Sequence, residues 1–152
     1  MQIIESIYLL LDGLYSESLR NYLSGYDCAS ASFVGPNVYA ELGLHTAIIV
    51  LLCSIVYYKV LDPTENKLFK WFMSLLTCAL IAMAWAYYLV SSAENKGLIG
   101  ACLLRDDNDN ALIGFMDYLG LGTSNAIIAA VLYFVLAMGM KFISTNNRYI
   151  PF

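Results

Sequence analysis

The stretch WFMSLLTCALIAMAWAYYLV, from Trp71 to Val90, holds no charged residue and constrains the fold more than any other part of the chain. At a rise of 1.5 Å per residue, about 20 apolar residues cross the hydrocarbon core of a bilayer. The whole chain is 60% hydrophobic and only 13% charged, whereas soluble domains carry roughly a quarter charged residues. We therefore expect an integral membrane protein.

Two other segments are long and apolar enough to span. Residues 42–61 end at Asp62-Pro63, where the proline disfavours helical geometry in the residue before it. Residues 122–141 are the cleanest part of a longer apolar region. The short link between the first two spans predicts an antiparallel hairpin. The expected fold class is an all-α membrane bundle of three transmembrane helices at 42–61, 71–90 and 122–141.

The remaining segments are assigned around these spans, within a single membrane domain covering 1–152. Residues 1–36 should form short amphipathic helices that lie on the membrane or on the bundle. Within them, Ser16 is expected to cap the second helix and Gly25 to close it. Residues 91–121 should form an external loop and an approach to the third span, with a glycine-permitted bend at 120–122. Residues 142–152 form a tail.

The basic residues predict the orientation. Lysine and arginine in short flanking segments favour the cytoplasmic side. The basic residues on one side are Lys59, Lys67, Lys70, Lys141 and Arg148, and those on the other are Arg20, Lys96 and Arg105. We expect a multi-pass protein of the cell membrane, with its C-terminus cytoplasmic and its N-terminus outside.

Small residues recur at helical spacing in two of the spans. The second span has them at Ser74, Cys78, Ala82 and Ala86, and the third at Gly122, Ala126 and Ala130. Such stripes let helix backbones approach closely in lipid, where no hydrophobic force drives association. They predict helix packing, either within the chain or between copies. Since three spans enclose little volume, we expect a homo-oligomer.

The four cysteines divide into two classes. Cys53 and Cys78 lie within spans and should behave as small apolar residues. Cys28 and Cys102 fall in segments placed on the same outer side. An oxidising compartment would allow these two to form a disulfide, or they are two unrelated thiols. No cysteine–histidine spacing indicates a metal site, and no cofactor is expected.

Glu41 and His45, the one histidine, lie one turn apart at the start of the first span. They are either a pH-responsive pair or an interfacial pair joined by a hydrogen bond.

Near the third span, Asp117, Ser124 and Asn125 are candidate polar or pore-lining residues. Asp117 would need a partner at membrane depth but not at the interface. GLGTSN is a poor match to a channel filter, because its Thr follows the Gly-x-Gly and the segment does not lie between two spans. The run RDDNDN has part of the spacing of a calcium loop, but its turn glycine is replaced by alanine, so a polar turn is favoured.

Three segments, DGLYSESLRNYLSGYDC, the link after Tyr57-Tyr58, and STNNRYIPF at 144–152, together carry a resemblance. They resemble a group of short, uncharacterised bacterial multi-span membrane proteins. The resemblance implies a small bacterial membrane protein and brings no activity with it.

Two functions follow as expectations. The first is a self-associating protein that forms a pore or channel-like assembly, for instance a membrane-permeabilising effector. The second is a non-catalytic structural or accessory subunit of a larger membrane complex, with a protein partner besides the lipid bilayer. An enzyme is not expected, because one histidine and no paired intramembrane carboxylates offer little catalytic chemistry. Nucleic-acid binding is not expected either, since the net charge is −4.

Overall fold

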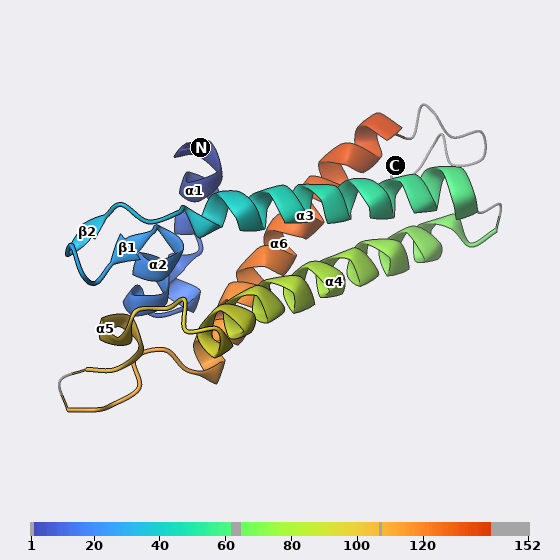
Figure 1. The fold of residues 1–152 in the computed structure, drawn as a ribbon. Helices are drawn as coiled ribbons and strands as arrows, with labels where there is room; N and C mark the ends of the chain where they lie inside the picture. Colours follow the sequence, from blue (N-terminus) through green and yellow to red (C-terminus); the bar gives the residue numbers. More distant parts are fainter. Residues whose placement is uncertain (1, 62–64, 107, 141–152) are drawn as a thin grey trace.

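The computed structural model describes residues 2–61, 65–106 and 108–140. Three long helices dominate it (Figure 1): α3 (Val38–Ile55), which continues into the π-helix η2 (Val56–Leu61), α4 (Lys67–Asn95) and α6 (Phe115–Met140). Each is long and apolar enough to cross a membrane. The prediction of three membrane-length apolar helices is confirmed.

The first two long helices start earlier than the apolar runs that revealed them. The backbone N–H of Ala40 donates to the side chain of Asn37 at 3.1 Å, and this cap starts α3 at Val38 instead of residue 42. Helix α4 extends past the expected 71–90 at both ends. A hydropathy pattern identifies only the apolar part of a helix, whereas the helix itself continues to its capping residues.

The third long helix corrects the sequence-based prediction. Helix α6 begins at Phe115 and runs without a break through 120–122, so the expected bend and approach segment are wrong. The Thr123 and Ser124 hydroxyls donate to the carbonyls one turn back, at Leu119 and Gly120, at 2.8 and 3.0 Å, as hydroxyls do inside a continuous helix. The glycines provide room for neighbours, as described below.

Helices α4 and α6 form the closest pair in the bundle. Cys78, Ala82 and Ala86 of the predicted α4 stripe are fully buried, and the Ser74 hydroxyl accepts a hydrogen bond from Tyr133 of α6 at 2.8 Å. A Cβ on Gly122 would lie 3.2 Å from the Met83 carbonyl oxygen, so this glycine allows close backbone approach. The small-residue face of α4 is therefore used within the chain.

On α6 the buried face is shifted from the predicted stripe. Ala126 and Ala130 are only half-buried. The fully buried positions repeat every four residues along the helix: Leu121, Asn125, Ala129, Tyr133 and Ala137. Larger residues interleave with alanines on this face, so a search for small residues alone missed it.

The N-terminal segments and the α4–α6 connection gather at one end of the bundle (Figure 1). They contain α1 (Gln2–Leu9), the 3-10 turn η1 (Asp12–Leu14), α2 (Glu17–Leu23), an antiparallel pair of short strands, β1 (Tyr26–Asp27) and β2 (Ser32–Phe33), and α5 (Ala101–Leu104). We call the described residues in 2–37 and 96–114 the cap. The strand pair was not expected from the sequence.

Two predicted helix ends in the cap are confirmed. The Ser16 hydroxyl accepts a hydrogen bond from the Leu19 backbone N–H, which caps α2. Gly25 follows the helix with a φ of +83°, a conformation that glycine adopts readily.

The outward faces of the three long helices are apolar. Midway along them, the exposed polar residues are Thr77 and Thr123, and both hydroxyls donate to carbonyls of their own helix at 2.8 Å. The remaining exposed positions there carry residues such as Ile48, Leu80 and Val131. These faces suit contact with lipid tails or apolar helices.

Candidate functional site

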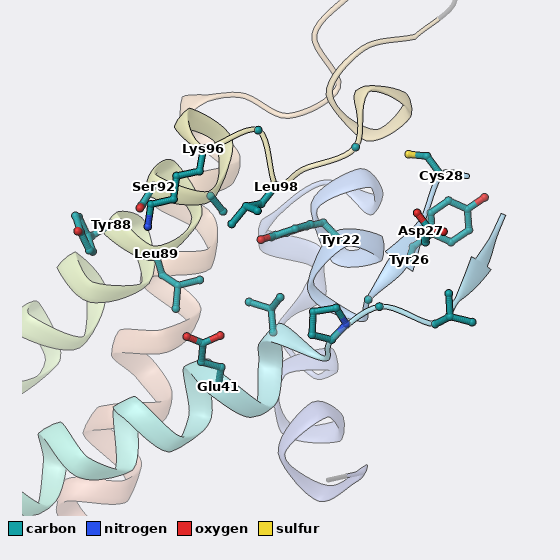
Figure 2. Close-up of a pocket in the computed structure, with 18 of the residues that line it drawn as sticks. Tyr22, Tyr26, Asp27, Cys28, Glu41, Tyr88, Leu89, Ser92, Lys96 and Leu98 are labelled. Atoms are coloured by element: carbon teal, nitrogen blue, oxygen red, sulfur yellow. The ribbon is translucent and has the colours of Figure 1, made fainter. Parts of the chain in front are cut away.

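The candidate site is an open pocket between the cap and the long helices, with a volume of about 900 Å³. Its walls come from α2, the strand pair, the first turns of α3 and the C-terminal turns of α4 (Figure 2). Ligand pockets typically enclose about 300–1,000 Å³. It is lined by charged and aromatic side chains, with Leu89, Leu98 and Val34 between them. A second groove lies toward the other end, lined mostly by apolar residues of α3, η2 and α4, together with Cys53, Lys70, Ser74 and Thr77.

Glu41 and His45 both line this pocket, but their side chains do not pair. His45 Nδ1 lies 2.8 Å from the backbone carbonyl oxygen of Glu41, and the ring packs on Trp85 with centroids 5.1 Å apart. The Glu41 carboxylate instead projects from α3 into the pocket (Figure 2). Burial and, secondly, this carboxylate raise the pKa of the Tyr22 hydroxyl across the pocket.

Cys28 and Cys102 are joined by a disulfide, with their Cα atoms 6.1 Å apart. The bond ties the strand-pair segment to α5 at the edge of the pocket. A Cβ on Gly100 would overlap the Cys28 sulfur, so glycine is required for this approach. Of the other two cysteines, Cys78 is buried and Cys53 is half-buried, in agreement with the prediction that they behave as packing residues.

Asp117 lies in the first turn of α6 and serves the cap. Its carboxylate accepts hydrogen bonds from the backbone N–H of Gly114 at 2.8 Å and of Ser16 at 2.7 Å. It thereby satisfies the start of α6 and fastens the start of α2 to it. Both partners are backbone N–H groups of the cap, so they leave no side-chain signal in the sequence.

Asn125 lies at the centre of the bundle, not on a passage through it. Its Oδ1 accepts hydrogen bonds from the hydroxyls of Tyr8 and Thr46, and its Nδ2 donates to the Ala82 carbonyl at 2.7 Å. Asn125 and Thr46 have no exposed surface. Ser124 is equally buried and bonds within α6 and to the Leu11 carbonyl. These contacts join α1, α3, α4 and α6.

Tyr8 and Thr46 were missed as members of this network. Tyr8 stands in a short N-terminal helix that was expected to rest on the membrane or on the other helices, and its hydroxyl reaches α6 across more than a hundred residues of sequence. Thr46 reads as an ordinary polar residue in a span. The one signal in the sequence was Asn125 itself, because a buried amide has several donors and acceptors that need partners.

The acidic run after α5 is a self-contained turn. The Asp106 carboxylate accepts hydrogen bonds from the backbone N–H groups of Asn108 and Asn110 and from the Asn110 side chain. These bonds, led by the Asn110 side chain, lower the pKa of Asp106. The favoured interpretation, a polar turn, describes this geometry.

No protein-family model, curated protein or solved structure matches this chain. The resemblance to short bacterial membrane proteins therefore gains no support from these comparisons, and what the protein does must be argued from its own geometry.

Proposed function

We propose that this protein is a non-catalytic accessory membrane subunit. Its three long helices act as an anchor, and its disulfide-linked cap presents a pocket at one membrane face. The observation that carries the proposal is the division of polar groups between these two parts. Inside the anchor, the buried hydroxyl and amide side chains of Thr46, Ser54 and Asn125 form hydrogen bonds within the chain. In the cap pocket, the charged side chains of Glu41 and Lys96 are exposed.

The contacts of the candidate pore-lining residues weigh against a pore. Ser124 and Asn125 are buried and hydrogen-bonded among helices of one chain, and Asp117 accepts hydrogen bonds from backbone N–H groups of the cap. The α4 stripe that argued for self-association packs against α6. Since the exposed middle of the described helices is apolar, copies placed side by side would bring no polar face to a shared passage. These observations favour the accessory role.

The oligomeric state tests the proposal. The full chain, purified in mild detergent with its disulfide intact, should behave as a monomer and should leave ion flux through liposomes at the level of empty vesicles. At native expression it should co-purify in fixed stoichiometry with a different membrane protein. A stable homo-oligomer that conducts ions would overturn the accessory role and restore the pore.

A further inference from the structure

The pocket presents two opposite charges that nothing in the structure neutralises. The carboxylate of Glu41, on α3, forms no hydrogen bond and no ion pair among the described residues, and neither does the ammonium of Lys96, at the end of α4. Both border the same opening (Figure 2). The third charged group, Asp27, is committed to its own turn through bonds to Ala29 and Ser30, which lower its pKa.

Aromatic side chains also line the pocket: Tyr22, Tyr26, Trp85 and Tyr88. Tyr22 and Tyr88 lie on the side of Glu41 and Lys96, whereas Tyr26 lies apart from them beside Cys28 (Figure 2). Trp85 packs against Tyr88 with centroids 5.8 Å apart, and its indole N–H is buried with no acceptor within the described part of the chain. Ring faces beside a carboxylate suit an alkylammonium group, which they attract through the ring quadrupole.

The net charge of the chain around the pocket also affects which ligand charge is favoured. Residues 1–41 and 94–117 hold ten acidic and three basic residues, a net charge of −7, whereas the rest of the chain holds two acidic and five basic residues. This field concentrates cations and disfavours simple anions. A simple cation, however, leaves Lys96 unpaired and repelled. A ligand with both charges satisfies both groups.

We propose that the pocket binds a net-neutral zwitterion in which an alkylammonium group is linked to a phosphodiester, as in glycerophosphoethanolamine. The ammonium lies against Glu41, beside the rings on that side of the pocket, and the phosphodiester lies against Lys96. Such a group is available free in solution or as the head of an aminophospholipid. Trp85 and Leu89, which line the pocket about two turns before the end of α4, would face the glycerol and acyl portion of a lipid. This inference is independent of the oligomeric state.

Binding measurements on the purified full chain test the proposal in two arms. The first is calorimetric titration of the protein in detergent with glycerophosphoethanolamine, ethanolamine and inorganic phosphate. The second measures retention of phosphatidylethanolamine against phosphatidylglycerol by native mass spectrometry of protein extracted from nanodiscs of both lipids. We expect glycerophosphoethanolamine to bind more tightly than ethanolamine or phosphate. Binding in the first arm identifies a free zwitterion as sufficient, and binding in the second alone identifies the lipid.

Three variants make the result specific. Glu41→Gln should weaken zwitterion or lipid binding about tenfold or more, as expected for loss of a charged partner. Lys96→Gln should weaken it similarly yet leave ethanolamine binding unchanged or stronger. Asp109→Asn is the control, because it removes an exposed cap carboxylate outside the pocket, and asparagine tolerates the positive φ of that residue. Intact disulfide and unchanged elution volume verify the fold of each variant. The proposal is overturned if neither arm shows binding, if phosphate alone binds as well, or if Glu41→Gln behaves like Asp109→Asn.

Discussion

Asn125 connects more of the molecule than any other described side chain in the bundle. It bonds to residues of α1, α3 and α4 from its place in α6. A buried amide without partners is costly in lipid, where water cannot replace them. Its contacts therefore fix the relative positions of four helices as well as satisfying its own polarity.

We predict that Asn125→Ala destabilises the fold by about 1–2 kcal/mol, because the Tyr8 hydroxyl loses its acceptor and the Ala82 carbonyl loses a donor, whereas the Thr46 hydroxyl keeps the Leu42 carbonyl at 2.8 Å. Thermal unfolding in mild detergent measures the change. Thr123→Ala is the matched control two residues away, since the Thr123 hydroxyl is exposed and bonds only within its own helix. Equal effects for the two variants would show that the network contributes nothing.

At the scale of elements, Gly120 determines how the cap meets the bundle. A Cβ at this position would overlap the backbone carbonyl of Leu14 in η1, whereas Gly139, on the same helix, has open space around it. We predict that Gly120→Ala displaces η1 and lowers stability. Gly139→Ala should be neutral or should stabilise by about 0.5–1 kcal/mol, as alanine does in an ordinary helix.

Hydrogen exchange at the backbone amides of Leu14 and Tyr15 distinguishes these outcomes. Both amides donate within the turn that contacts Gly120, to Leu11 and Asp12 at 3.2 and 3.3 Å. Faster exchange in Gly120→Ala but not in Gly139→Ala is expected. Similar protection in both variants would contradict the close contact.

The contact with α6 gives the small-residue stripe of α4 a role within the chain. Ala82 is fully buried against α6, so Ala82→Leu should overpack this contact and destabilise the monomer by about 1–3 kcal/mol. Ala84→Leu, at an exposed position two residues on, should leave stability unchanged. Unfolding midpoints in detergent, with the chain mass measured in parallel, report the difference. A change of oligomeric state without loss of monomer stability would return the stripe to an interface between copies.

Local sequence patterns predicted the parts of the fold that depend on local physics. Long apolar runs predicted the three membrane-length helices, and Ser16 and Gly25 predicted the ends of α2. The pocket was not predicted, although Glu41 and His45, which were singled out as a pair, both line it. The continuous α6 was missed, because its glycines read as a bend when their neighbours in space, Leu14 and Met83, were unknown. The role of Asp117 was missed for the same reason.

At the scale of the whole molecule, the disulfide braces the cap. Cys28 and Cys102 are 74 residues apart in sequence, and a link over such a distance stabilises by about 2–4 kcal/mol in typical cases. We predict that Cys28→Ser with Cys102→Ser loosens the cap while the long helices keep their contacts. Faster hydrogen exchange in α2 and α5, with unchanged exchange at the centre of α6, would bear this out. Uniform loss of protection would show that the cap and the anchor unfold together.

The position of this disulfide also has a topological consequence. The chain between its two cysteines contains all of α3, η2 and α4. Two of the three long helices therefore belong to one covalent ring, closed at the cap, while α6 lies outside it. A single backbone cut between the two cysteines would leave both pieces joined by the disulfide until a reductant separates them. During biogenesis, the ring cannot close before both of its helices are in place, so formation of the bond would record completed insertion of the hairpin.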